Sequence, residues 1–198
     1  NNIKVTGSLS NDNYKKKFDR KFFLNKPFIL ITFHSVTNSD NKNDSNVKYL
    51  LDSLKKYKKF NLLFTSSNHD EGGRKINYLI KSFVNLNKNS VFVPNLGRDL
   101  YYQAMHDCEF MIGNSSSGII ESMLYKKPAI NILPRQLGRI SNKNVINCKN
   151  NVNDICKSID KAISTKFKKK CMRLKNFFKK TDIKPSKIML KEIIKKYG

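Results

Sequence analysis

The chain has 198 residues, which is enough to bury the core of one ordinary domain. Apolar residues make up 39% of it and recur in separated runs, which excludes a disordered chain, and no run reaches the roughly 20 residues of a membrane span. The formal charge of +24 raises the possibility of a nucleic-acid or membrane-surface protein, but the lysines are spread over the polar faces of almost every predicted helix. A solvated basic surface is therefore the simpler interpretation.

Strands and helices are predicted to alternate along the chain. Continuous β-branched and aromatic runs indicate buried strands, and apolar residues three or four positions apart indicate helices. The expected strands are 28–33, 62–64, 91–93, 110–112, 129–132 and 145–146, and the expected helices are 47–57, 76–83, 101–108, one carrying Glu121, and 155–163. This order predicts an α/β, Rossmann-like three-layer domain with a mostly parallel sheet and helices on both faces.

The last part of the chain concentrates the positive charge. Apolar residues are interleaved with its lysines at helical spacing: Phe167, Met172, Leu174, Phe177, Phe178, Ile188, Leu190, Ile193 and Ile194. This pattern indicates amphipathic helices with an apolar side that needs a partner. We therefore divide the chain into a Rossmann-like domain, residues 1–165, and basic C-terminal helices, residues 166–198.

Cysteine and histidine show no spacing typical of a metal site. The residues concerned are Cys108, Cys148, Cys156 and Cys171, and His34, His69 and His106. The cysteines lie in different predicted elements, which favours reduced thiols in a cytoplasmic protein. We expect neither a metal nor a cofactor.

The most informative segment is 110–121, FMIGNSSSGIIE, where an apolar run changes abruptly to small hydroxyl and glycine residues before a helix. Serine hydroxyls, free amides and a helix N-terminus suit an anion such as phosphate. The turn is expected to need the backbone freedom of Gly118, so an added methyl group there should be harmful. Taken alone, the pattern fits a polar loop with a serine cap equally well.

Other polar groups are expected at the same end of the sheet. His34 follows the strand at 28–33, and Arg135 and Arg139 follow the strand at 129–132. Ligands of open α/β sheets bind beyond the carboxyl ends of the strands. A histidine, a hydroxyl-rich loop and arginines in one crevice would suit a negatively charged nucleotide sugar.

Several motifs, in their order and spacing, resemble the UDP-N-acetylglucosamine 2-epimerase family. They are residues 34–37 (HSVT), 93–101 (VPNLGRDLY), 113–121 (GNSSSGIIE), 127–132 (KPAINI) and 135–139 (RQLGR). The resemblance runs from about Ile3 to the last helix and is to the carboxyl-terminal domain, most closely of the hydrolysing branch. It implies one half of a two-domain enzyme of GT-B type, with the amino-terminal domain missing from this chain.

The resemblance implies roles for individual residues. Ser115 and Ser116 would bind the diphosphate of UDP, and Glu121 would hold the ribose hydroxyls. Tyr101 would pack on the uracil ring, and the backbone near Leu96 would read the edge of the base.

Further roles are implied nearer the reacting bond. His34 matches a histidine beside the diphosphate, Arg135 an arginine whose charge would stabilise departing UDP, and Arg139 belongs to the same UDP-binding element. Gly7 matches the hinge, although residues 8–10 (SLS) lack the proline that the family usually has there.

The implied reaction eliminates UDP from UDP-N-acetylglucosamine and then adds water, which releases N-acetylmannosamine in the hydrolysing branch. The acid and base carboxylates would lie on the missing domain, so this chain alone should bind without turnover. The full-length protein is expected to be a homo-oligomer, with neither a specific nucleic acid nor a membrane as partner.

Two other functions remain open from the sequence. A UDP-sugar-binding half of a GT-B glycosyltransferase would share the sheet and the serine loop, residues 113–118 (GNSSSG), but it should lack the Arg-Gln-x-Gly-Arg element of residues 135–139. A basic nucleic-acid or membrane-surface module would use the lysines, but the chain offers no recognised binding fold for it.

Overall fold

A six-stranded parallel sheet forms the centre of the molecule. The computed structural model describes residues 3–18, 22, 24–25, 27–36, 43–68, 70 and 72–197, so Thr37 and His69 lie outside the described residues. The strands are β1 (Phe28–Thr32), β2 (Asn61–Thr65), β3 (Ser90–Val93), β4 (Phe110–Gly113), β5 (Ala129–Ile132) and β6 (Val145–Cys148). Their order is β3-β2-β1-β4-β5-β6 and every pairing is parallel. The predicted Rossmann-like fold is confirmed.

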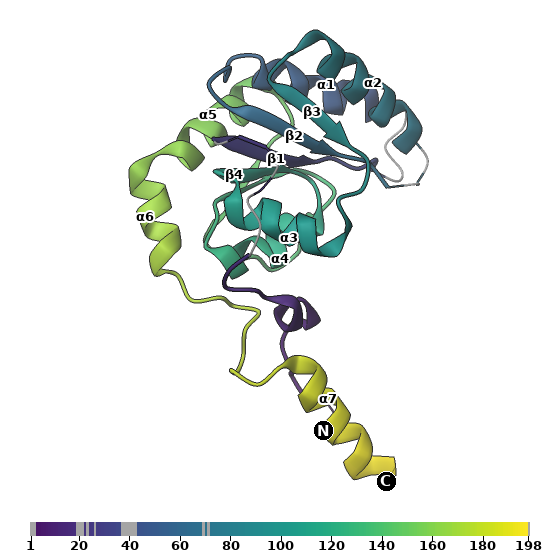
Figure 1. Cartoon of the computed structure of the whole chain (residues 1–198), viewed down its shortest axis with the longest axis vertical. Coiled ribbons are helices and arrows are strands. Elements are labelled where there is room, and N and C mark those ends of the chain that lie inside the picture. The colour runs from purple at the N-terminus through teal and green to yellow at the C-terminus, as the bar shows by residue number, and fades with distance from the viewer. Residues whose placement is uncertain are drawn as a thin grey trace.

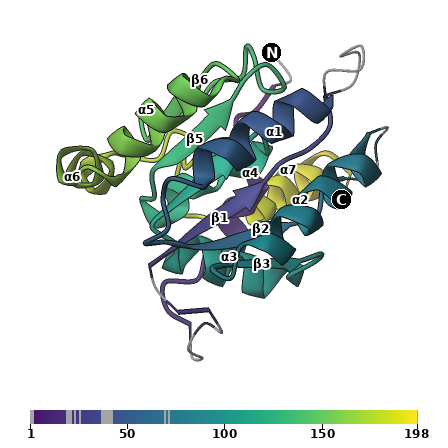
Figure 2. The same ribbon diagram turned by 90° about the horizontal axis from the view of Figure 1, so that it is seen from above.

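Helices cover both faces of this sheet, as Figure 2 shows. One face carries α1 (Asn43–Leu54), α2 (Gly73–Leu86), α5 (Val152–Ile163) and α6 (Thr165–Arg173). The other carries α3 (Gly97–Asp107), α4 (Ser116–Ile120) and the 3-10 helix η2 (Ser122–Tyr125). The sequence predicted Glu121 inside a helix, but the residue occupies the junction between α4 and η2.

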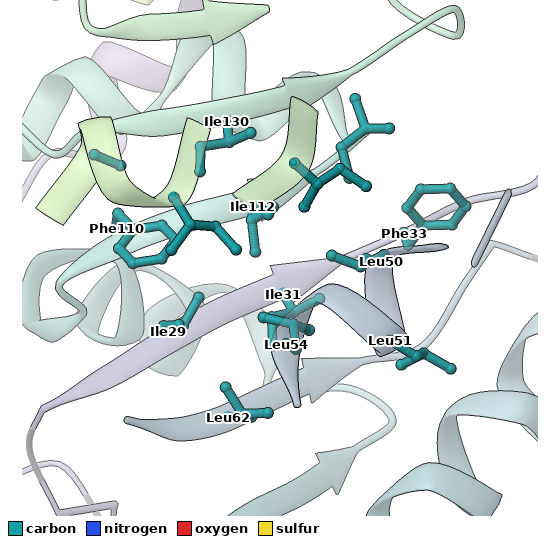
Figure 3. Packing of buried hydrophobic residues seen from close by; sticks show 14 of the residues in the cluster. Ile29, Ile31, Phe33, Leu50, Leu51, Leu54, Leu62, Phe110, Ile112 and Ile130 are labelled. Carbon is teal, nitrogen blue, oxygen red and sulfur yellow. The ribbon is translucent and has the colours of Figure 1, made fainter. Parts of the chain in front are cut away.

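Alternation along the buried strands supplies a core on each face. Ile29 and Ile31 of β1 point to the side of α1, where Leu50 and Leu54 meet them (Figure 3). Their neighbours Phe28 and Leu30 point to the side of α3. A parallel strand covered on both faces needs apolar residues at every position, which explains the continuous run in this part of the sequence.

The helix α7 (Pro185–Tyr197) projects from the sheet with the N-terminal residues beside it (Figure 1). We call α7 and residues 3–14, which include the 3-10 helix η1 (Leu9–Asn13), the terminal arm. Asn11 Nδ2 donates to the carbonyl oxygen of Phe178 at 2.8 Å, and the Ser186 N–H donates to Asp12 at 3.2 Å. The arm leaves large apolar side chains exposed: Ile3, Val5, Leu190, Ile193, Ile194 and Tyr197.

Gly7 lies where the N-terminal segment meets the chain that leads to α7. Its φ of +92° is in the left-handed region, and a Cβ there would lie 2.8 Å from the carbonyl oxygen of Phe178. Glycine is therefore needed for this contact, and its role as a hinge stays a prediction.

The described residues contain neither a membrane-spanning helix nor a metal-ligating cluster. No helix in this part of the chain has both the length and the apolar character needed to cross a membrane. Within the same residues, no His, Cys, Asp and Glu side chains gather in a cluster suited to a metal ion.

Candidate functional site

The serine loop begins with a glycine that allows two strands to approach closely. Gly113, the last residue of β4, has φ of +148°, and a Cβ on it would lie 1.9 Å from the carbonyl oxygen of Thr32 in β1. Gly118 lies inside α4, and a Cβ on it would only touch the Ala129 side chain at 3.9 Å. The expectation for Gly118 was wrong, because the strained position is Gly113.

Ser115 ends the turn and caps α4. Its Oγ accepts hydrogen bonds from the N–H of Ser117 at 3.4 Å and from Ser117 Oγ at 3.0 Å. Ser115 and Ser116 are both half-buried. Because α4 is only 5 residues long, an anion bound here would depend on hydroxyl and amide donors, and the helix dipole would contribute less than the sequence suggested.

Asn114 joins the loops that follow β1, β4 and β5. Its Oδ1 accepts from the His34 N–H at 2.7 Å, and its Nδ2 donates to the His34 carbonyl at 2.8 Å. Its own carbonyl oxygen accepts from Gln136 Nε2 at 2.9 Å and from Arg135 Nη1 at 3.3 Å. The structure thus brings His34, the serine loop and Arg135 together, as the sequence predicted.

Sequence reasoning missed Asn114 and Gln136. Both side chains are almost fully buried, with 1% and 4% of their surface exposed. Each is an uncharged amide in a motif whose serine, glutamate or arginine side chains offer the more obvious functional groups. Buried amides beside a turn are expected to bond to the backbone, and that is the signal that could have identified them.

His34 is held as a neutral imidazole. The N–H of Asn68 donates to His34 Nδ1 at 3.0 Å, so Nδ1 carries no proton and the ring proton is on Nε2. Burial and the charge of Arg135 lower the pKa of His34 to about 4, against an opposing effect of Asp70. Near pH 7, His34 can therefore donate a hydrogen bond but cannot supply positive charge.

The positive charge of the site comes from the arginines. Burial lowers the pKa of Arg135 from its ordinary value, and the carboxylate of Asp70 opposes this. An arginine guanidinium stays charged in proteins. The hydrogen bond from Arg135 to Asn114 uses one of five donors. Arg139 is exposed, and its positive charge also lowers the pKa of Arg135. Both arginines can therefore attract an anion beside the serine loop.

The two neighbouring tyrosines of α3 reach different parts of the site. Tyr101 Oη lies 2.7 Å from Ser117 Oγ, whereas the Tyr102 hydroxyl donates to Glu121 Oε1 at 3.3 Å. Burial raises the pKa of Glu121, and the hydrogen bond from Tyr102 lowers it. Leu96, also buried, is the residue that precedes α3. Tyr101 thus contacts the serine loop directly, whereas Glu121, just after α4, is linked to α3 through Tyr102.

Residues 1–186 match the family model described as UDP-N-acetylglucosamine 2-epimerase. The chain belongs to the UDP-N-acetylglucosamine 2-epimerase family. A GDP/UDP-N,N'-diacetylbacillosamine 2-epimerase (hydrolyzing) of Campylobacter jejuni is 36% identical over 167 residues, which cover 84% of this chain and 42% of that protein. The polysialic acid biosynthesis protein P7 of Escherichia coli is 30% identical over 155 residues, 77% of this chain and 39% of that protein. This epimerase-family chain thus spans about two fifths of these relatives.

Solved structures share the fold of this epimerase-family chain. S. aureus MnaA in a co-structure with UDP superposes with a TM-score of 0.73 at 15% identity, covering 98% of this chain and 52% of MnaA. The UDP-GlcNAc 2-epimerase of Methanocaldococcus jannaschii, in complex with UDP-GlcNAc and UDP, gives a TM-score of 0.65 at 19% identity over 87% of this chain and 46% of that one. The likeness agrees with one half of a GT-B architecture.

The neutral state of His34 predicts a pH dependence of the epimerase-family domain. The unfolded chain takes up a proton near the ordinary pKa of 6.5, whereas folded His34 resists it until about pH 4. The free energy of unfolding should therefore fall as the pH drops through this window. Chemical denaturation of the wild type and of His34→Gln at pH 7, 5.5 and 4.5 measures the effect.

The substituted protein should lose less stability over this range than the wild type, because it lacks the histidine whose protonation favours the unfolded chain. Other acidic groups titrate in both proteins and account for the loss that remains. Identical pH profiles would show that His34 does not resist protonation.

Proposed function

We propose that this chain is the UDP-binding half of a hydrolysing UDP-N-acetylglucosamine 2-epimerase. The observation that carries the proposal is the junction at Asn114, which holds His34, the serine loop and Arg135 at the carboxyl edge of the sheet. Family membership, the hydrolyzing relative of C. jejuni and the UDP co-structures of fold relatives support it. The E. coli relative's name supports a place in polysaccharide biosynthesis.

Each part of UDP has a candidate partner. Ser115 and Ser116 offer neutral donors to the diphosphate, while the carboxylate of Glu121 suits a ribose diol, which can donate two hydrogen bonds. The Tyr101 ring is proposed to pack on uracil, and the backbone near Leu96 to read the base edge.

The contribution of this half to catalysis is leaving-group stabilisation. When the bond between the sugar C1 and the UDP oxygen breaks, negative charge grows on the diphosphate, and the proton lost from C2 goes to a base on the preceding domain. The charge of Arg135, supported by Arg139, and a hydrogen bond from neutral His34 would stabilise that growing charge. Water then adds to the intermediate.

The terminal arm is proposed to contact the preceding domain. Ile193 and Ile194 of α7 are more than half exposed, at 56% and 58%, on a helix that projects from the sheet. An amphipathic helix gains stability when its apolar side is covered. We therefore place the missing amino-terminal domain against this side of α7. The helix α6 stays with the UDP-binding domain, because its Phe167 and Cys171 are buried in the core of the sheet.

Calorimetric titration of the chain with UDP and UMP tests the proposal. In EDTA, UDP should bind with one-to-one stoichiometry and more tightly than UMP, because only UDP has the second phosphate for Ser115 and Ser116. Saturable binding should persist at moderate salt, unlike the diffuse attraction of a basic surface. Equal affinities for UDP and UMP, or binding only with a divalent cation, would contradict a metal-free diphosphate site.

The ribose contact gives a second prediction. Glu121→Ala should weaken UDP more than 2',3'-dideoxy-UDP, because only UDP can donate both ribose hydroxyls to the carboxylate. The differential loss should be about 1 to 3 kcal/mol, the range for a hydrogen bond to a charged group. The same titration measures both ligands, and equal losses would assign Glu121 a structural role.

A further inference from the structure

A continuous chain of hydroxyl groups runs from the buried sheet to the serine loop. Thr65 Oγ1 and Thr32 Oγ1, paired neighbours in β2 and β1, lie 2.8 Å apart. Thr32 Oγ1 lies 3.3 Å from Tyr101 Oη, which is 2.7 Å from Ser117 Oγ, and Ser117 Oγ is 3.0 Å from Ser115 Oγ. Tyr101 is therefore the link between the rigid sheet and the loop.

The single hydrogen of each hydroxyl fixes the direction of the outer part of this chain, from Tyr101 to Ser115, whereas Thr65 Oγ1 has a second acceptor in the Ile31 carbonyl oxygen at 3.4 Å. Ser117 donates its hydrogen to Ser115, so the contact between Tyr101 and Ser117 requires the tyrosine to donate. Ser115 Oγ also accepts the N–H of Ser117, so both its acceptor sites are used. Among the hydrogen bonds of the described residues, Ser115 Oγ donates none, which leaves its hydrogen for a ligand.

Burial strengthens the arrangement. Thr32 and Thr65 are each 7% exposed and are held by the parallel pairing of their strands, so the inner end of the chain is fixed. Burial raises the pKa of Tyr101, which keeps its phenol protonated and able to donate. Hydrogen bonds in such a chain polarise one another, so donation from Tyr101 makes the Ser115 hydroxyl a better donor.

We propose that Tyr101 is a positioning residue whose hydroxyl aims the Ser115 hydroxyl, through Ser117, at the diphosphate of the ligand. This inference rests on the proposed function and adds to the ring-packing role of Tyr101. The ring acts on the base, whereas the hydroxyl acts on the phosphates at the other end of the nucleotide. The two roles can therefore be separated by removing the oxygen alone.

The experiment compares Tyr101→Phe with the wild type by calorimetry with UDP and uridine. The substitution keeps the ring, so uridine affinity should stay unchanged while UDP affinity falls about 3- to 10-fold, as expected for one hydrogen bond. Tyr78→Phe, which removes an exposed hydroxyl on α2, is the matched control and should change neither affinity. Thermal unfolding confirms that each variant is folded.

A double-substitution cycle with Ser117→Ala tests the link itself. If the hydroxyls act as one chain, Tyr101→Phe should cause no further loss of UDP affinity in the Ser117→Ala background. Additive losses would overturn the proposal, and so would an unchanged UDP affinity of Tyr101→Phe or an equal loss for uridine. Ser117→Ala also keeps the proposal testable if Tyr101→Phe is unstable, because it should lower UDP but not uridine affinity.

The outcomes separate this inference from the function on which it rests. A wild-type chain with no preference for UDP over uridine would overturn the diphosphate site and, with it, the role of Tyr101. A wild type that prefers UDP, with a Tyr101→Phe variant that retains the full preference, would overturn only the positioning role.

Discussion

Gly113→Ala should destabilise the domain by about 3 kcal/mol or more, the range for side chains forced into a forbidden backbone conformation or a clash. The new Cβ would lie 1.9 Å from the carbonyl oxygen of Thr32, at a φ of +148°. Neither group can move easily, because both belong to paired central strands. Urea denaturation measures the change in the free energy of unfolding.

Gly118→Ala is the matched control for this prediction. It lies in the same motif but inside α4, where the added methyl group meets only Ala129 at 3.9 Å. Alanine is favoured over glycine in a helix by up to about 1 kcal/mol, so the unfolding free energy should be unchanged or slightly higher. Similar effects of the two substitutions would show that the close approach at Gly113 is not needed.

Asn114→Ala should weaken UDP roughly 10- to 100-fold and lower stability by about 2 to 4 kcal/mol, since unpaired buried groups cost about 1 to 3 kcal/mol each. The substitution leaves the His34 N–H and carbonyl oxygen without the partners that lie at 2.7 and 2.8 Å. The loops after β1 and β4 would then lose their fixed relation. Calorimetry with UDP and chemical denaturation measure the two effects.

Asn144→Ala separates stability from binding in this test. Asn144 is fully buried and donates to Ser122 Oγ and the Lys127 carbonyl, at the end of the sheet opposite the serine loop. It should lower stability to a similar extent and leave UDP affinity largely intact. If both substitutions weakened UDP equally, the effect of Asn114 would reflect general destabilisation of the fold.

Local patterns were sufficient to predict most elements of this fold. The run at 28–33 predicted β1, and the apolar spacing at 76–83 predicted the centre of α2, because periodicity reports which faces of an element are covered. Ends were less accurate. The helix after the serine loop stops at Ile120, and Glu121 follows it, since the chain tightens there into η2.

The residues of the candidate site were predicted more completely than their contacts. His34, Ser115 and Arg135 were expected at one edge because each follows a strand of a parallel sheet. That rule places backbone positions and does not reach hydrogen-bond partners. It could not show that Tyr101 and Tyr102, adjacent in sequence, contact Ser117 and Glu121 respectively.

By itself, the sequence determined the parallel α/β architecture and the edge at which the polar motifs gather. Hydrophobic periodicity and the alternation of strands and helices can both be read along the chain without knowledge of the tertiary structure. Only the tertiary structure decided which glycine is indispensable and which residue joins the site. Gly113 is constrained by an oxygen of β1, and Asn114 bonds to His34 across 80 residues of sequence. Close approach and hydrogen bonding depend on distances between segments that meet only when the sheet has formed.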